Sequence, residues 1–555
     1  MTDRTPTAPT LTALLDRAAA EFPAAGVAFP PETTRVPLPE LAAAAAAVAG
    51  GLAALGTGPG RRVGVLYGTE PDFLRAVFGI LRTGAAVCPL PLPTTSRDLP
   101  AYLDRLTGIV TAAELTHVVV SGRLGALEAP LAAQLGVPLV KVAELADAAD
   151  PAPDRSEPEQ PAIIQFTSGS TAAPKGVVLA HRAVAAGLDA IIRGAELDPE
   201  RDSGASWLPL YHDMGLFGTL SAMSIGMPVT LWSPAYFIRR PDRWLAAMAR
   251  EGHTVCPLPN FAYDQLVDQV PAADMAELDL SRWRIAFNGA EMVSVESVEA
   301  FLAHAAPAGF RPEAMFPVYG LAEATLAVTF PPLGRPPQAD WVDRDLLAAA
   351  GRAKPVGRGA PGARAVMGLG RAVPGMSVRV ADPATGAVRP DREVGEVQAR
   401  GASVTSGYLA GDGADLFTPD GWLRTGDLGY LVDGELHLTG RIKDMMIVRG
   451  ANYYPEDVES IARGATGVYK RRCVAFVVGA GDGGGGPERM VLAAETPVRD
   501  AGDRLQLASH LRGRVSAALG LTDLEVHLLP PRSIPRTTSG KLRRQATREL
   551  VAPFV

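Results

Sequence analysis

Strand-like and helix-like spacings of apolar residues alternate along the first 330 residues of the chain. A short apolar run at Arg62–Tyr67 is typical of a buried strand, and Pro71–Thr83 follows with apolar residues at helical spacing. Ala85–Cys88 is strand-like again, and the same signal returns at Thr116–Val120 and Ala162–Phe166. This order of strand, helix and strand predicts parallel sheets that are covered by helices.

A different pattern begins after about residue 440. It contains a helix signal at Pro455–Ile461, strand signals at Cys473–Val478 and Arg489–Glu495, and a helix signal at Asp503–Leu519. These elements predict a small α+β domain of about 110 residues, which is within the normal domain range. We therefore expect an α/β protein with an N-terminal domain over residues 1–440 and a C-terminal domain over residues 441–555.

Two segments interrupt these patterns. Asp150–Gln160 is acidic and rich in proline, so we expect a surface connector there. Pro331–Gly368 is rich in Pro, Gly, Ala and Arg, with one short helical stretch at Trp341–Ala350. Compact domains seldom hold about 40 residues so poor in structure unless the segment is a functional insertion or a mobile loop.

Composition and charge narrow the class of protein. The 555 residues are 47% hydrophobic and 20% charged, as in an ordinary soluble protein of several folding units. The net charge of -7 argues against a nucleic-acid binder. The three cysteines are far apart and form no metal-ligand cluster, which favours buried thiols in a reducing compartment. The N-terminus lacks a signal-peptide pattern, and Leu41–Leu55 is too short to span a bilayer, so we expect a cytoplasmic protein.

One stretch carries most of the recognisable chemistry. It follows a buried apolar strand and precedes a helical pattern, and its hydroxyls and amides could surround phosphate oxygens while a lysine adds positive charge. The pattern is not the P-loop of kinases, and by itself it could also be a linker. The candidate phosphate-binding residues are Thr167, Ser168, Gly169, Ser170, Thr171 and Lys175.

Together with six further motifs, this loop resembles the adenylate-forming superfamily, which includes acyl-CoA ligases, firefly luciferase and the adenylation domains of peptide synthetases. All seven motifs occur in the order found in that family. The further motifs are Tyr211–Gly215, Asn288–Glu291, Tyr319–Thr325, Gly421–Asp427, Gly440–Asp444 and Pro535–Lys541. The resemblance implies ATP and Mg²⁺ as cofactors and a carboxylic acid as substrate. It also implies parallel or mixed sheets with covering helices plus a distorted barrel in the N-terminal domain, and a small mobile α+β C-terminal domain.

The same resemblance assigns roles at the nucleotide. Glu323 at a predicted strand end would hold Mg²⁺, although a lone glutamate in a turn is usually only solvated. Tyr319 offers a face for adenine stacking, with a packing aromatic as the alternative. The residues expected around the nucleotide in these two motifs are Asn288, Gly289, Ala290, Glu291, Tyr319, Gly320, Ala322 and Thr325.

Further roles follow for the later motifs. Asp427 resembles the family's ribose-binding aspartate, with Arg441 as its companion, and Lys443 falls at the family's interdomain hinge. Lys541 lies in a Thr-Thr-Ser-Gly run that we expect to be flexible, and its ammonium suits transient stabilisation of the attacking carboxylate and the α-phosphate. The basic tail around it could instead be a solvated face. His212 would act as a gate beside the acid, with a packed histidine as the alternative.

Three details resemble fatty acyl-AMP ligases rather than CoA ligases. They are the particular residues within the motifs, the 46 residues between Glu323 and Gly370, and the hinge sequence Val448–Asn452. In that family the insertion, here about 331–368, is thought to hinder the closure used for CoA, and the acyl group passes to an acyl carrier protein. Because the sequence shows no carrier-domain pattern after Lys541, we expect transfer to occur in trans.

The acceptor and the acid are less well defined by the sequence. The alternatives are a CoA ligase with the same first step and a non-catalytic relative that binds nucleotide or carrier protein. An apolar acid pocket is expected near Gly218–Met227 and Trp232–Phe237, although these residues would also serve as core.

Overall fold

The computed structural model describes residues 9–31, 34–93, 99–167, 175–409, 411, 415–448, 451–479, 488–521, 524–537 and 540–554. Contacts divide the chain into two compact units. Unit 1 comprises Met1–Pro337, Gly370–Val378 and Ala399–Leu423, and unit 2 comprises Gln338–Leu369, Arg379–Gln398 and Arg424–Val555. Residues 338–369 therefore group with the C-terminal part of the chain, and the expected border at residues 440 and 441 stays a prediction.

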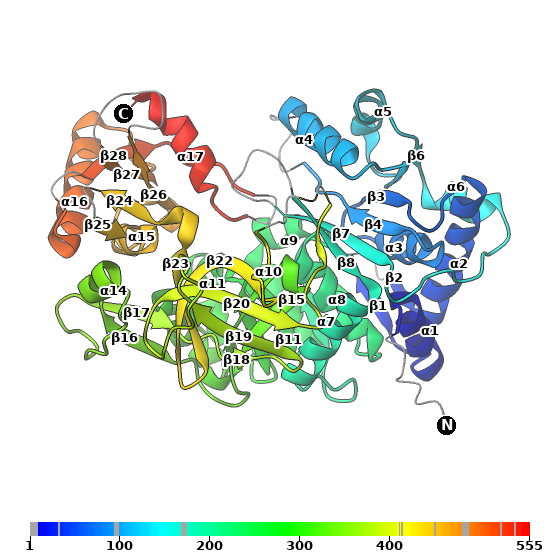
Figure 1. The fold of residues 1–555 in the computed structure, drawn as a ribbon, viewed down its shortest axis with the longest axis horizontal. Helices are drawn as coiled ribbons and strands as arrows, with labels where there is room; N and C mark the ends of the chain where they lie inside the picture. The colour runs from blue at the N-terminus through cyan, green and yellow to red at the C-terminus, as the bar shows by residue number, and fades with distance from the viewer. Residues whose placement is uncertain are drawn as a thin grey trace. The chain divides into compact units, whose positions relative to one another are not determined.

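The first large sheet of unit 1 has the strand order β21-β8-β7-β4-β3-β5-β6. Strands β3 to β7 are parallel where they pair, whereas β8 runs antiparallel to β7. Helices α2 (Leu38–Ala54) and α3 (Pro71–Arg82) lie beside this sheet in Figure 1, and α3 buries its periodic apolar residues, as the spacing predicts. The strands are β3 (Arg62–Leu66), β4 (Ala86–Pro89), β5 (His117–Val120), β6 (Leu139–Val140), β7 (Pro161–Thr167), β8 (Lys175–Ala180) and β21 (Gly407–Tyr408).

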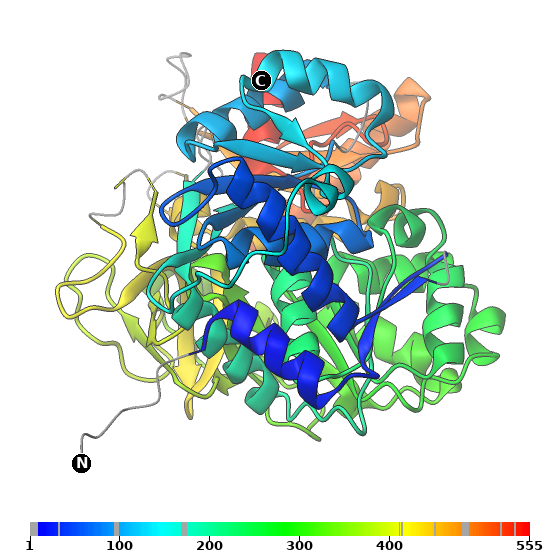
Figure 2. The same ribbon diagram turned by 90° about the vertical axis from the view of Figure 1, so that its right-hand side faces the viewer.

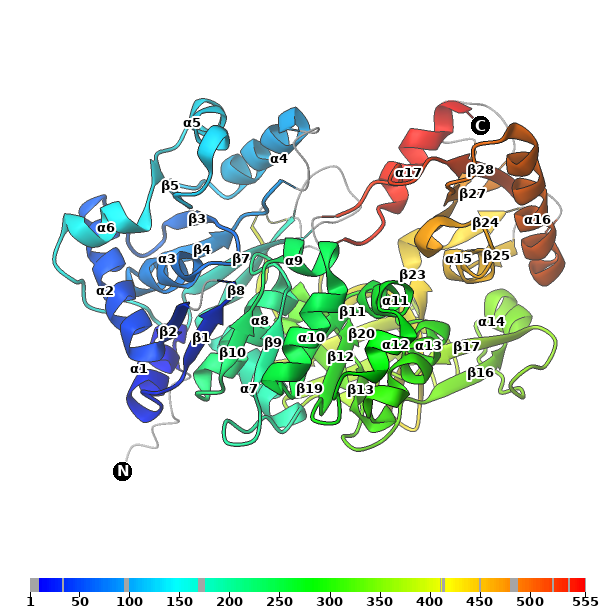
Figure 3. The same cartoon turned by 180° about the vertical axis from the view of Figure 1, so that it is seen from behind.

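The second large sheet has the order β13-β12-β11-β9-β10-β1-β2. All neighbouring strands are parallel except β1 and β2. Helices α10 (Pro241–Glu251), α11 (Asn260–Gln269) and α13 (Val295–Ala305) lie in front of it in Figure 3. The strands are β1 (Gly26–Phe29), β2 (Thr34–Pro37), β9 (Gly204–Ser206), β10 (Val229–Leu231), β11 (Val255–Pro259), β12 (Ile285–Gly289) and β13 (Met315–Pro317).

Smaller sheets follow where a distorted barrel was expected. One has the order β14-β15-β18 and another the order β19-β20-β22-β23. The predicted mixed α/β fold class is confirmed. These strands are β14 (Tyr319–Leu321), β15 (Leu326–Phe330), β18 (Arg371–Ala372), β19 (Met376–Ala381), β20 (Gly395–Gly401), β22 (Leu423–Val432) and β23 (Glu435–Arg441).

The C-terminal part of unit 2 has a three-stranded sheet with helices on both faces. Strand β26 (Cys473–Val478) pairs antiparallel with β27 (Arg489–Glu495), which pairs parallel with β28 (Leu524–Leu529). Helices α15 (Pro455–Arg463) and α16 (Ala501–Leu519) share one apolar cluster with this sheet, and α17 (Arg544–Val551) contributes to another. The predicted elements of this region are confirmed, and β28 and α17 are additional.

The insertion has more structure than its composition indicates. It forms β16 (Ala339–Asp343), α14 (Arg344–Ala350) and β17 (Ala363–Met367), and the two strands pair antiparallel. The helix expected over Trp341–Ala350 thus begins only at Arg344, because the residues before it belong to β16. Three apolar residues fix this structure by packing against Leu428, Tyr430 and Tyr454 within unit 2, and Figure 1 shows α14 next to β25 (Ala451–Tyr453). The three are Val342, Leu347 and Val366.

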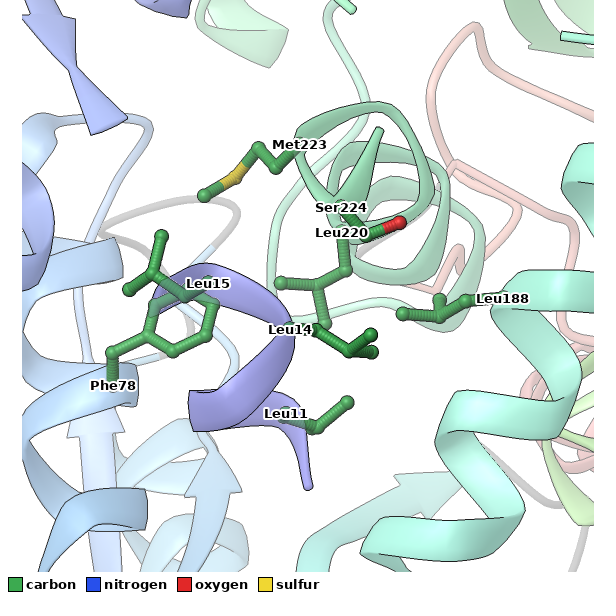
Figure 4. Close-up of a pocket in the computed structure, with 8 residues that line it drawn as sticks. All are labelled: Leu11, Leu14, Leu15, Phe78, Leu188, Leu220, Met223 and Ser224. Carbon is green, nitrogen blue, oxygen red and sulfur yellow. The ribbon is translucent and has the colours of Figure 1, made fainter. Parts of the chain in front are cut away.

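A small cavity lies inside unit 1 between α1 (Leu11–Glu21), α3, α7 (His181–Gly194) and α8 (Asp213–Ser224). Its volume of about 10 Å³ is lined by apolar side chains and Ser224 (Figure 4). Helix α1 is the dark-blue helix at the front of Figure 2. That volume holds about one water molecule and excludes an acyl chain. Among the helices that the structure describes, none is long and apolar enough to cross a membrane. The cytoplasmic location stays a prediction.

Candidate active site

Several polar residues of unit 1, among them expected site residues, follow the carboxyl ends of parallel strands. The Tyr211–His212 pair comes after β9, Asn260 directly follows β11, and the Asn288 turn begins at the end of β12. Strand β13 ends at Pro317, opposite Asn288 in the sheet register. In open α/β sheets, ligands bind outside the carboxyl ends of the strands, so the topology gathers these motifs at one edge.

The Asn288 turn is tightly built. Asn288 is fully buried, its Nδ2 donates to Asn260 Oδ1 at 3.5 Å, and its Oδ1 has no hydrogen-bond partner in the described part of the chain. A Cβ on Gly289 would lie 2.8 Å from Val318 Cγ2, and Ala290 has a left-handed φ of 67°. Glu291 Oε1 accepts a hydrogen bond from the backbone N–H of Phe261 at 2.6 Å. The buried, unpaired Asn288 oxygen is therefore the group in this turn that suits a polar ligand edge.

The Tyr319 motif forms β14 and the turn after it. A Cβ at Gly320 would lie 1.7 Å from the carbonyl oxygen of Leu326, so the strand pairing requires glycine. Tyr319 is 7% exposed, and Ala322 is buried. Thr325 is fully buried with φ 52°, and its hydroxyl donates to the carbonyl of Ser403 at 2.7 Å. Thr325 braces the turn in this way, and its contact with nucleotide stays a prediction.

The phosphate-binding loop connects two paired strands. Thr167 ends β7 and faces Lys175, which begins β8. Ser168, Gly169, Ser170 and Thr171 lie outside the described residues. The helix expected directly after the loop is preceded by β8, and α7 begins only at His181. The expectation missed this hairpin because a seven-residue connection lacks the Asn-Gly or Gly-Gly signature of tight turns.

Glu323 has one carboxylate oxygen bonded and one open. Its Oε1 accepts a hydrogen bond from the phenol of Tyr408 at 2.7 Å, and its Oε2 has no partner among the residues that the structure describes. A half-buried carboxylate with an open oxygen fits a hard cation such as Mg²⁺. Burial and the nearby Glu323 charge raise the pKa of Tyr408, so the phenol keeps its proton and donates. Sequence reasoning missed Tyr408.

His212 lies at the N-terminal end of α8. Its ring centroid is 4.9 Å from that of Tyr211, and the carbonyl of Tyr211 accepts a hydrogen bond from Gln165 Nε2 at 2.9 Å. Gln165 is a buried residue of β7, so it connects the strand before the phosphate-binding loop to the His212 segment. The structure thus brings the expected acid and phosphate regions of unit 1 together.

Two expected ribose residues form an ion pair in unit 2. Asp427 and Arg441 are cross-strand partners in β22 and β23, and Arg441 Nε lies 2.8 Å from Asp427 Oδ1. Asp427 is 4% exposed, whereas the Arg441 side chain is 53% exposed. Lys443 follows in a short turn over Ile442–Asp444, which lies inside unit 2. The ribose and hinge roles stay predictions.

Lys541 lies in a hydrogen-bonded turn. Its N–H donates to Thr537 Oγ1 at 3.1 Å, and its carbonyl accepts from the Thr537 N–H at 2.8 Å. The next helix begins at Arg544, whose guanidinium bonds Glu459 and lies 3.6 Å from Glu456. The side chain of Arg544 is 22% exposed, so this part of the basic tail is packed and not a solvated face.

Comparisons with known proteins identify the family of this chain. The family model of the AMP-binding enzymes matches residues 15–409. The chain is 34% identical to a putative acyl-CoA synthetase of Caulobacter vibrioides, over 92% of this chain and 89% of the relative. It is 33% identical to a long-chain-fatty-acid–AMP ligase of Mycolicibacterium smegmatis, over 89% and 85%. A solved structure from a study of fatty acyl-adenylate ligases of E. coli and L. pneumophila superposes with a TM-score of 0.91 at 33% identity, covering 98% of both chains. The chain therefore belongs to the AMP-binding enzymes, as an adenylate-forming ligase that resembles the fatty acyl-AMP ligases.

Proposed function

We propose that this ligase activates a fatty or similarly lipophilic acid and passes the acyl group to the phosphopantetheine thiol of an acyl carrier protein in trans. In the first half-reaction, a carboxylate oxygen of the acid attacks the α-phosphorus of ATP. The bond from the α-phosphorus to the bridging oxygen breaks, and pyrophosphate leaves. In the second, the thiol sulfur attacks the acyl carbonyl, loses its proton, and displaces AMP.

The chain's own residues have distinct tasks in the first half-reaction. Lys541 stabilises the charge shared by the attacking carboxylate and the α-phosphate, while Lys175 binds phosphate oxygens beside the β7–β8 loop. Asp427 accepts hydrogen bonds from the ribose, and His212 lies beside the acid. Glu323 would hold Mg²⁺, which would neutralise phosphate charge. Residues 441–555 form the mobile part, with Lys443 at the hinge.

The observation that carries the acceptor assignment is that the insertion bonds to chain on both sides of Lys443. Before Lys443, the Tyr430 phenol donates to Asp340 at 2.8 Å, and Arg364 Nη2 donates to the carbonyl of Thr439 at 2.8 Å. After Lys443, Arg364 Nε lies 2.9 Å from Asp457 Oδ1, and its guanidinium lies 4.4 Å from the Tyr454 ring centroid.

Rotation at Lys443 would separate these partners. The side chains of Arg364 and Asp457 are each 9% exposed, so the rotation would have to separate a buried ion pair. A second bond, from Arg344 Nη1 to the carbonyl of Ala518 at 3.1 Å, would also break. Because CoA ligases of the superfamily use such a closure to admit CoA, the insertion favours a carrier protein over CoA as acceptor.

The acid assignment is supported by the apolar surroundings of α8. Trp207 stacks on Phe237 with ring centroids 4.0 Å apart, and both are buried. On α8, a Cβ at Gly218 would meet no atom within 4 Å, whereas one at Gly215 would lie 2.3 Å from the carbonyl oxygen of Pro209. Open space beside a buried apolar helix suits an alkyl chain. Relatives named as long-chain-fatty-acid–AMP ligases support the same class.

Two assays test the proposal. Pyrophosphate release with a panel of acids should be greatest for lipophilic acids, and no release with any acid would favour a non-catalytic nucleotide- or carrier-binding relative. The purified acyl-adenylate is then offered to CoA or to a holo-carrier protein. We expect the thioester of the carrier, and equal transfer to CoA would favour the alternative of an acyl-CoA ligase.

A further inference from the structure

A single tyrosine contacts two charged residues of the expected phosphate and metal sites. The Tyr408 phenol donates to Glu323 Oε1 at 2.7 Å, and Lys175 Nζ lies 5.2 Å from the centroid of the same ring. That second distance is within the range of a cation–π contact. The hydroxyl therefore bonds the carboxylate, while the ring faces the ammonium group.

The backbone around Tyr408 is hydrogen-bonded both to strand β8 and to the turn that contains Glu323. Strand β21 pairs antiparallel with β8, so Tyr408 faces Val177, two residues after Lys175. On the other side, the N–H of Thr405 donates to the carbonyl of Glu323 at 2.7 Å, and the Thr405 hydroxyl donates to the carbonyl of Val178. Each contact lies within unit 1, so the ring is held between strand β8 and the Glu323 turn.

The two contacts have a shared electrostatic effect. Hydrogen bonding to Glu323 Oε1 leaves Oε2 as the oxygen available to a cation, and it fixes the plane of the carboxylate. The ring face attracts and restrains the ammonium of Lys175, the residue at which the loop ends and β8 begins. The Tyr408 side chain thus holds both the Lys175 cation and the Glu323 anion, which we expect to contact the same magnesium-bound ATP.

We propose that Tyr408 is a positioning residue that sets Glu323 for the metal ion and Lys175 for the phosphates of magnesium-bound ATP. The inference rests on the roles proposed above for Glu323 and Lys175. It assigns no contact between Tyr408 and substrate. Its specific consequence is that loss of the phenol weakens the binding of ATP only where the metal takes part.

The test is calorimetric titration of the full-length protein with ATP, once with excess Mg²⁺ and once with EDTA. Tyr408→Phe removes the hydrogen bond and keeps the ring. A hydrogen bond to a charged group contributes enough that we expect about tenfold weaker binding of magnesium-bound ATP. Binding of metal-free ATP should be unchanged. Tyr408→Leu also removes the ring, so it should weaken metal-free ATP as well.

Tyr430→Phe is the matched control, because it removes a phenol that bonds the Asp340 carboxylate at a similar distance of 2.8 Å in unit 2. It should change neither affinity. Equal weakening with and without Mg²⁺ in Tyr408→Phe, or no weakening, overturns the inference.

Glu323→Gln separates this inference from the proposed metal site. If Glu323→Gln weakens magnesium-bound ATP and Tyr408→Phe does not, the positioning role alone fails. If Glu323→Gln has no effect, the proposed metal ligand fails, and the inference fails with it. In the Glu323→Gln background, Tyr408→Phe should add less than twofold, because the carboxylate it orients is absent. Melting temperatures confirm that each variant is folded.

Discussion

Replacing Asp457 by Asn should loosen the insertion and admit CoA. The substitution leaves the Arg364 cation buried beside a neutral amide, and it keeps the contacts of Arg364 with the Thr439 carbonyl and the Tyr454 ring. Breaking a buried ion pair costs about 3–5 kcal/mol, and the remaining partners place the expected loss at the lower end, about 3 kcal/mol. Each 1.4 kcal/mol is a factor of ten, so the insertion should detach on the order of 100-fold more often.

Two measurements follow this detachment. Hydrogen exchange at the amides of β17 should accelerate by up to about 100-fold in Asp457→Asn, since local opening governs exchange. The ratio of CoA thioester to carrier thioester formed from purified acyl-adenylate should rise, while the rate of pyrophosphate release stays near that of the unmodified protein. The first half-reaction does not require the insertion to detach.

Asp382→Asn is the matched control. Asp382 pairs with Arg389 in the same unit, but the Arg389 side chain is 37% exposed, and exposed pairs contribute about 0–1 kcal/mol. This variant should exchange and transfer like the unmodified protein. If Asp457→Asn behaves like Asp382→Asn in both measurements, the Arg364–Asp457 pair does not restrain the insertion and does not limit transfer to CoA.

Three further outcomes are expected. Lys541→Ala should lose most pyrophosphate release while ATP binding, measured by calorimetry, stays largely intact; undiminished release would refute the catalytic role. Gly218→Phe should shift the preference toward shorter acids in the same release assay, because its side chain would occupy the open space beside α8; an unchanged chain-length profile would contradict this position for the pocket. Burial lowers the pKa of His181 from 6.5 to about 4, so the folded protein resists protonation that the unfolded chain accepts. Stability should be complete above pH 6.5 and should fall by about 3 kcal/mol as the pH drops to 4. His181→Asn, which keeps an acceptor for the Leu11 N–H, should flatten this dependence in denaturant titrations, and an equally steep curve would exclude His181 as its cause.

Elements with strong local periodicity could be predicted from the sequence. The pattern over residues 473–478 and 489–495 matches β26 and β27 because each strand is built on an unbroken apolar run, which in β27 lies between Arg489 and Glu495. Strand β16 was missed because its burial alternates weakly, and only Val342 of the strand is fully enclosed. Its stability comes from Leu428 and Tyr430, which are distant in the chain.

In the candidate site, too, residues within local motifs could be predicted, whereas contacts between distant segments could not. The motif sequences alone could identify Glu323 and Lys175, since each lies in a distinctive local sequence. Tyr408 belongs to a two-residue strand and is 85 residues from Glu323, so no local pattern connects the two. The Arg364–Asp457 pair is equally non-local. Contacts made by tertiary packing leave no periodic signal, and a single sequence does not reveal them.

The discontinuity of unit 2 has a consequence for synthesis on the ribosome. Val366 emerges 88 residues before Tyr454, one of the residues that covers the insertion. At a synthesis rate of about 5–20 residues per second, Tyr454 is added roughly 4 to 18 s after Val366. Nascent chains of this protein therefore pass through a stage in which Val342, Leu347 and Val366 lack the cover of Tyr454, and we expect chaperones to bind the insertion at that stage.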